Sequence, residues 1–276
     1  MFEDVVIPLD QWVSVFVEWL VDNYRDVFQM LKWPVEQLLN GFEHGLNAIH
    51  PLIIIAVVCF AAWKFSGKRL AIFSAAAMFF VGLLGLWEDT MITLAMVLSS
   101  VVICTLFGVP LGIMAGRSDR FEMTLRPILD AMQTTPAFVY LVPIVMLFSV
   151  GNVAGVFATI IFALPPIIRL TSLGIRGVHP ELVEAAQAFG ATRWQVLMKV
   201  QIPLALPTIL AGLNQTIMMA LSMVVIAALI GAGGLGSPVI LGLNTLDIGR
   251  AVVGGVGIVL MAIVLDRITQ SMAQRK

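Results

Sequence analysis

Few residues of this sequence have the types and spacing that catalysis or metal binding requires. Its two cysteines, Cys59 and Cys104, lie in separate apolar runs, and its three histidines, His44, His50 and His179, are scattered along the chain. Neither set has the spacing of a metal site, so we expect buried thiols and capping or interfacial imidazoles. We therefore predict no catalytic residue and no metal ion.

The glycine motifs of the sequence have structural explanations. Residues 231–236 match the G-x-G-x-x-G expression of dinucleotide-binding folds, but they follow an apolar helix instead of a strand. We interpret them as a turn or a hinge. Gly108, Gly112 and Gly116 form a stripe that lets a neighbouring helix approach closely. The phosphate-binding motif G-x-x-x-x-G-K-[ST] is missing from the sequence, so we expect no ATP hydrolysis and no cofactor bound by this chain.

The most informative polar segment covers residues 178–204, between two apolar runs. Pro180 suits the first turn of a helix, Gly190 can adopt the left-handed conformation that ends one, and Thr192 can cap a second. Small and acidic residues along the first helix would keep it slim and polar. The pattern predicts a helix, a glycine turn and a second helix, which together project from the membrane as a knob.

A second group of polar and aromatic residues lies within or beside apolar runs that contain prolines. Proline frees a backbone carbonyl that neighbours or water must satisfy, so these positions indicate bent helices beside a cavity or gate. We predict that the translocation path or gate is lined by Gln133, Thr134, Thr135, Pro136, Phe138, Tyr140, Asn214, Gln215 and Ser222. Hydrogen bonding between helices explains each polar member equally well. Phe138 and Tyr140 could contact a cation through their ring faces, although core packing is the simpler role.

The composition places these residues in a membrane. Hydrophobic residues make up 59% of the 276 residues and charged residues 12%, with a mean hydropathy of +0.98. About 20 apolar residues suffice to cross a bilayer as a helix. Windows of this kind cover residues 46–63, 70–86, 91–116, 128–150, 153–175, 204–230 and 248–265. The predicted fold is an all-α membrane protein with about seven transmembrane helices.

The basic residues orient these spans, because cytoplasmic loops carry an excess of lysine and arginine. Seven spans place on one face Lys64, Lys68, Arg69, Arg117, Arg120, Arg126, Arg169, Arg176, Arg193, Lys199, Arg267, Arg275 and Lys276. Only Arg25, Lys32 and Arg250 remain opposite. We therefore expect the amino terminus outside and the carboxyl terminus in the cytoplasm. The net charge of −1 argues against a nucleic-acid partner.

The segment before the first span is amphipathic. Polar residues recur every three or four positions from Gln11 to Lys32, with tryptophans and aliphatic residues on the other side. We predict that residues 1–45 form an external segment whose helix lies on the membrane lipid. Packing against the bundle or a partner fits the pattern equally well. Residues 46–89 would then supply two accessory spans, retained in the mature protein because the acidic start lacks a signal-peptide pattern.

The polar segment carries a family resemblance. Residues 184–186 read Glu-Ala-Ala, Gly190 follows four residues after Ala186, and residues 202–204 read Ile-Pro-Leu. This pattern resembles the EAA loop of permeases of binding-protein-dependent ABC importers. The resemblance implies a type I permease core over residues 90–270 and a loop, 178–204, that couples to a cytoplasmic ATPase. The coupling residues would be Glu181, Glu184, Ala185, Ala186, Gly190, Arg193, Ile202 and Pro203.

Residues 130–143, 214–216 and 221–227 are similar to the permeases of glycine betaine and proline betaine uptake systems. The resemblance runs from about Leu9 to the end of the chain. It implies a bacterial inner-membrane importer with two permease copies, two ATPase subunits that bind ATP and Mg²⁺, and an external substrate-binding protein. The expected cargo is glycine betaine, proline betaine, choline, carnitine or trimethylamine N-oxide. An ion-coupled secondary transporter is the alternative, disfavoured because we expect no charged residue at mid-depth of a span.

Overall fold

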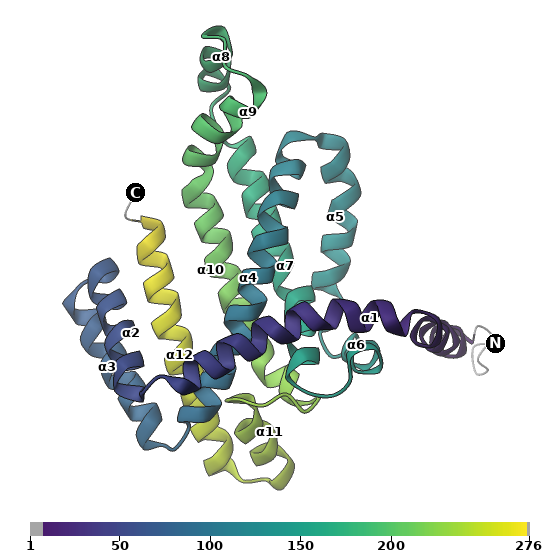
Figure 1. Cartoon of the computed structure of the whole chain (residues 1–276), viewed down its shortest axis with the longest axis vertical. Helices are drawn as coiled ribbons and strands as arrows, with labels where there is room; N and C mark the ends of the chain where they lie inside the picture. Colours follow the sequence, from purple (N-terminus) through teal and green to yellow (C-terminus); the bar gives the residue numbers. More distant parts are fainter. Residues whose placement is uncertain (1–7, 275–276) are drawn as a thin grey trace, which may run out of the picture.

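The computed structural model describes residues 8–274, and all regular elements in that range are helices (Figure 1). The expected acidic start and the basic residues 275–276 lie outside the described part. The helices are α1 (Leu9–Ala48), α2 (Pro51–Ser66), α3 (Lys68–Leu83), α4 (Trp87–Arg117), α5 (Asp119–Thr134), α6 (Leu141–Phe148), α7 (Asn152–Arg176), α8 (Pro180–Ala188), α9 (Arg193–Val196), the π-helix η1 (Leu197–Gln201), α10 (Ile202–Ala228), α11 (Gly236–Thr245) and α12 (Ile248–Gln274). The predicted all-α fold is confirmed.

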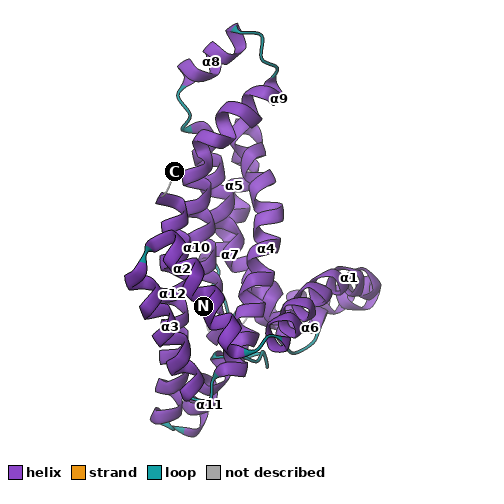
Figure 2. Ribbon diagram, turned by 60° about the vertical axis from the view of Figure 1, so that its left-hand side comes forward, coloured by secondary structure: helices purple, strands orange, loops and turns teal. Residues whose placement is uncertain are grey.

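Helices α8 and α9 project from one end of the bundle, which we call the knob end (Figures 1 and 2). Helices α2, α4, α7 and α12 run toward this end, whereas α3, α5 and α10 run away from it. The connections at Gly67 and Ser118 therefore point toward the knob end. Three of the basic residues that the sequence groups on one face flank the first connection and three flank the second: Lys64, Lys68 and Arg69, and Arg117, Arg120 and Arg126.

The core of the bundle is formed by α4, α7 and α10. Gly112 of α4 lies so close to α7 that an added Cβ would stand 2.5 Å from the Cβ of Thr171 and 2.7 Å from the Ile168 carbonyl oxygen. In α10, the Thr216 hydroxyl donates to the Ala163 carbonyl of α7 at 3.0 Å. The glycine stripe thus acts as predicted, because only a residue without a side chain permits this approach.

Within residues 8–274, four helical stretches are long and apolar enough to cross a membrane: α4, α7, the continuous run 193–228, and α12. Helices α1 and α2 form a fifth candidate only as a pair bent by 105°. Helices α2 and α3 have 16 residues each, or about 24 Å at 1.5 Å per residue. This length is short of a hydrocarbon core of about 30 Å. The two helices pair as a hairpin that packs against α12.

The prediction of one continuous span over residues 128–150 is wrong. The helix begins earlier, at Asp119, and ends at Thr134; the chain becomes helical again only at Leu141. Thr135 adopts an extended conformation with a ψ of 125°, because the residue before a proline avoids the helical region. The resulting pair of short helices, α5 and α6, leaves a non-helical break around Pro136.

Helix α1 crosses the bundle near the end opposite the knob (Figure 1). Its second half packs on the core, where Val35 and Leu39 are buried together with Met96 and Val156. Its first half extends beyond the bundle and exposes apolar side chains such as Trp12, which is 61% exposed. The amphipathic helix is confirmed, and packing on the bundle explains only its second half.

Candidate functional site

The knob folds through local signals. Pro180 stands in the first turn of α8, and Gly190 has a φ of +82°, which suits glycine. The Thr192 hydroxyl accepts from the Gln195 backbone N–H at 3.3 Å, while the Gln195 side chain accepts from the Thr192 N–H at 2.8 Å. This reciprocal capping box starts α9. The helix, glycine turn and second helix therefore lie where the sequence predicts them.

The surface of the knob is largely exposed in the described chain. Glu181, Glu184, Ala185, Gly190 and Arg193 are exposed, and Ala186 is partly buried. Two large apolar side chains accompany them on α8 and at the glycine turn: Leu182 is 46% exposed and Phe189 is 91% exposed. Apolar side chains gathered on a projecting surface indicate a protein interface. The knob thus offers a compact docking surface of aromatic and acidic groups.

A π-helical turn joins the knob to the core. In η1 the Ile202 N–H donates to the Leu197 carbonyl, five residues earlier, and Pro203 then begins α10 without a backbone donor. Leu197 and Ala205 on either side of this turn are buried in the main hydrophobic cluster. Single π-turns are common at functional sites. Ile202 and Pro203, predicted as coupling residues, therefore lie at the joint between the knob and α10.

Several predicted path residues share one exposed face. Gln215 and Ser222 are exposed on α10, and Met219 lies between them on the same side at helical spacing. The Gln133 side-chain nitrogen of α5 lies 3.9 Å from the Met219 sulfur. Thr134 is also exposed, and its hydroxyl donates to the Asp130 carbonyl at 2.9 Å. The end of α5 and this stripe of α10 thus form one surface, which we call the path face.

The break after α5 presents the other members of the predicted set. Pro136 and Phe138 are exposed, with Phe138 at 63%, whereas Thr135 is partly buried. Tyr140 packs in a cluster with Phe148 and Met223, and its buried hydroxyl has no hydrogen-bond partner in the described chain. Tyr140 therefore occupies a packing position, while Phe138 remains available.

Asn214 is engaged elsewhere, at the contact between α10 and α12. Its side-chain nitrogen donates to the Asp266 carboxylate at 3.0 Å, and its oxygen accepts from the Thr269 hydroxyl. Gln270 also donates to Asp266 at 3.0 Å. Of the two roles that the sequence left open for Asn214, the structure shows hydrogen bonding between helices.

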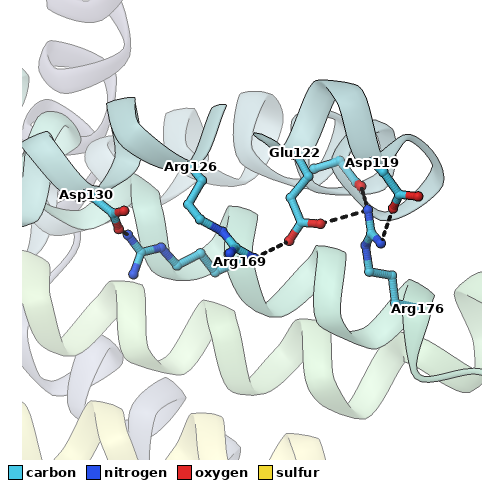
Figure 3. Close-up of polar contacts among 7 residues, drawn as sticks. Asp119, Glu122, Arg126, Asp130, Arg169 and Arg176 are labelled. Atoms are coloured by element: carbon cyan, nitrogen blue, oxygen red, sulfur yellow. Dashed lines mark hydrogen bonds and ion pairs between the residues drawn. The ribbon is translucent and has the colours of Figure 1, made fainter. Parts of the chain in front are cut away.

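Ion pairs that the sequence analysis did not find join α5 to α7 (Figure 3). Arg176, at the end of α7, lies 2.5 Å from the Asp119 carboxylate and 2.8 Å from the Glu122 carboxylate. The same guanidinium donates to the Ala115 carbonyl of α4 at 2.7 Å. Arg176 therefore holds three helices together at the knob end.

A second pair lies deeper along the same contact. Arg169 lies 2.5 Å from the Asp130 carboxylate, about 10 Å along α7 from Arg176 at 1.5 Å per residue. The two pairs border a cavity of about 390 Å³ between α5 and α7. The signal in the sequence was the spacing of Asp119, Glu122 and Asp130 on one face of α5.

We expect Arg176→Gln to loosen α5. Hydrogen bonds to charged groups contribute about 1.5–3 kcal/mol, so amide exchange in α5 should rise about tenfold or more when this hub is removed. Arg126→Gln is the matched control, because the Arg126 side chain is 68% exposed and pairs only with Glu122 on its own helix. Hydrogen–deuterium exchange of both variants in lipid nanodiscs makes the comparison. Equal protection of α5 in the two variants would contradict the assigned role.

These features define a class of protein. A helical bundle that combines several helices of membrane-crossing length with a projecting helix–turn–helix knob is the arrangement expected of a transport permease. The chain is similar in structure to a chain of the MetNI methionine ABC transporter in inward-facing conformations, with a TM-score of 0.56 and 26% identity over 66% of this chain and 90% of that one.

The chain belongs to the family described as the inner membrane component of binding-protein-dependent transport systems, whose model matches residues 108–276. It is 53% identical to the glycine betaine/proline betaine transport system permease protein ProW of Escherichia coli (strain K12), over 99% of this chain and 77% of the relative. It is 45% identical to the glycine betaine transport system permease protein OpuAB of Bacillus subtilis (strain 168), over 98% and 96% of the two chains. The chain is thus an inner-membrane transport permease and not an enzyme.

Proposed function

We propose that this permease carries a small methylated ammonium solute, of the glycine betaine type, into the bacterial cytoplasm. The names of both relatives state glycine betaine transport. The structural observation that carries the transport role is the exposed knob with its aromatic and acidic surface. The break after α5 offers exposed Phe138, whose ring can contact a methylated cation weakly enough to release it. Choline, carnitine, proline betaine and trimethylamine N-oxide share this chemistry.

The proposal assigns energy supply to a partner. Two ATPase subunits, which bind ATP and Mg²⁺, would receive the knobs of two permease copies in their clefts. Closure of the ATPase pair would displace the knob, and the π-helical joint would pass that displacement to α10. Because α10 packs on α7 over its length, the two helices would move together. The coupling is mechanical, and the named coupling residues lie on the knob and at its joint.

A second copy of the permease would complete the path. Gln215 and Ser222 are exposed on α10, which belongs to a stretch long and apolar enough to cross a membrane. Polar side chains avoid lipid by facing a bundle interior or a water-filled cavity. Two copies that face each other would enclose these residues between them. An external binding protein would deliver solute to this space, and the family description calls such transport systems binding-protein-dependent.

The proposed orientation places the knob end in the cytoplasm. The loops around Gly67 and Ser118 are basic and lie toward this end, in agreement with the positive-inside rule. The amino terminus and α1 would then lie outside, and α12 would end in the cytoplasm. A reporter at residue 190 should be protected from a membrane-impermeant reagent added outside, whereas one in α1 should react.

The test is ATP hydrolysis in liposomes that contain the permease and its ATPase partner. Hydrolysis should be stimulated only when binding protein and one methylated ammonium solute are both present, and that solute should accumulate inside. Stimulation by an unrelated amino acid alone would reject the solute class. Uptake driven by an ion gradient without ATP would reject the importer mechanism itself.

A further inference from the structure

An open groove lies at the knob end, separate from the path face and from the cavity between α5 and α7. It has a volume of about 700 Å³. One wall is the last two turns of α4, from Pro110 to Arg117, and the opposite wall is α9 with η1, through Trp194 and Met198. The start of α5 closes it at Phe121. The groove therefore runs beside the joint through which the knob meets α10.

Most of the groove lining is apolar, and three of its large apolar side chains are substantially exposed. Ile113 and Met114 of α4 face Trp194, Leu197 and Met198 across it. Met114 is 52% exposed, Trp194 62% and Met198 47%. Such a concentration of exposed apolar and aromatic side chains needs an apolar occupant. Because the wall formed by α4 belongs to a membrane-crossing helix, hydrocarbon chains are its default neighbours at this depth.

One charge stands at the mouth of the groove. Arg117 is the last residue of α4, and its side chain is exposed and forms no ion pair within residues 8–274. Arg169 and Arg176, by contrast, are paired with carboxylates of α5. Arg117 lies about 10 Å beyond Pro110 at 1.5 Å per residue. The groove thus changes from apolar to cationic along the direction in which α4 leaves the membrane.

The nearby carboxylates do not neutralise this arginine. Asp119 and Glu122, in the first turn of α5, are both bound by Arg176. Glu122 lines the cavity between α5 and α7, and neither carboxylate lines the groove. An anion at the mouth would therefore find the free guanidinium of Arg117. Guanidinium groups bind phosphate well, because their donors match the geometry of its oxygens.

We propose that this groove binds an anionic membrane phospholipid. The phosphate would lie at Arg117, and an acyl chain would lie along Ile113 and Met114 against Trp194. Basic pockets between membrane helices on the cytoplasmic side bind anionic headgroups in this way. The assignment to the inner leaflet rests on the proposed orientation. A lipid in this position wedges between α4 and the joint at η1, so its presence sets how firmly the knob is held.

The experiment uses the complete permease–ATPase complex in nanodiscs and the fluorescence of Trp194. The contribution of Trp194 is the fluorescence intensity of the natural chain minus that of the Trp194→Phe variant. Brominated phosphatidylglycerol should quench this signal at least twofold more than brominated phosphatidylcholine at the same density. Arg117→Gln should remove the preference for the anionic lipid, and Arg117→Lys, which keeps the charge, should retain it. Arg120→Gln is the control, since it makes the same change of charge outside the groove.

Two results would overturn the proposal. Absence of quenching by either lipid would show that another subunit covers the groove in the complex. Equal quenching by both lipids, unchanged in Arg117→Gln, would show ordinary contact with bulk lipid. Neither result bears on solute uptake or on stimulation by the binding protein, so the proposed transport function is tested separately.

Discussion

Replacing Phe189 with serine should weaken the association of the permease with its ATPase subunits by about tenfold to a hundredfold. Phe189 is 91% exposed at the glycine turn of the knob. Burial of a phenylalanine side chain contributes about 1.5–3 kcal/mol, and each 1.4 kcal/mol corresponds to about a tenfold change in affinity. Because the side chain has few contacts within its own chain, the permease should fold normally. Titration of the ATPase subunit onto permease nanodiscs measures the affinity, and ATP-driven uptake should fall with it.

Leu246→Ser is the matched control for this variant. Leu246 is 88% exposed, but it lies at the opposite end of the bundle between α11 and α12. Its replacement should leave the affinity unchanged.

Glu184→Lys tests the charged part of the knob surface, since Glu184 is exposed and reversal of its charge should disturb a complementary cleft. If Phe189→Ser and Glu184→Lys both bind and stimulate normally, the knob is not the ATPase interface.

Gly112→Ala should destabilise the bundle strongly for so small a change. The added Cβ would stand 2.5 Å from the Cβ of Thr171 and 2.7 Å from the Ile168 carbonyl oxygen. Neither atom can move without the α7 backbone, and overpacking of this kind costs about 1–3 kcal/mol. The gain in helix propensity from glycine to alanine, about 1 kcal/mol, is smaller or comparable. We expect an apparent melting temperature lower by about 5 °C in detergent.

Gly255→Ala provides the control for helix propensity. An added Cβ at Gly255 of α12 would have no neighbour within 4 Å in the described chain. The melting temperature of this variant should equal that of the natural protein or lie slightly above it. Tryptophan fluorescence during heating, with size-exclusion chromatography of each purified variant, makes the comparison. A melting temperature for Gly112→Ala equal to that of Gly255→Ala would show that α4 and α7 can separate at this point without cost.

Features that depend on neighbouring residues could be predicted from the sequence. Pro180, Gly190 and Thr192 act within a few residues of themselves, so the helix–turn–helix of the knob followed from their types and spacing. The amphipathic pattern of residues 11–32 identified α1 for the same reason. The apolar runs that form α4, α7, α10 and α12 also followed, because hydrophobic length is a local property of the chain.

The span predicted over residues 128–150 was wrong because its apolar content was given more weight than its Pro136. The apolar content after Ile128 suggested one long helix, while Thr135–Pro136 ended it. Polar residues from Asp119 onward did not prevent helix formation, because their carboxylates find arginines on α7. The apolar content of a stretch of sequence carries no information about such partners on other helices. The start of the helix was therefore predicted nine residues too late.

The sequence by itself determined the class of the protein: an all-helical membrane permease with a projecting helix–turn–helix knob. Only the tertiary structure decided which polar residues meet. It paired Asn214 with Asp266 and Arg176 with Asp119, and it left Gln215 and Ser222 on an open face. The physical reason is that each pairing depends on the distance and rotation between helices far apart in the chain. Periodicity places a residue on one side of its own helix, but packing alone determines which neighbour lies on that side.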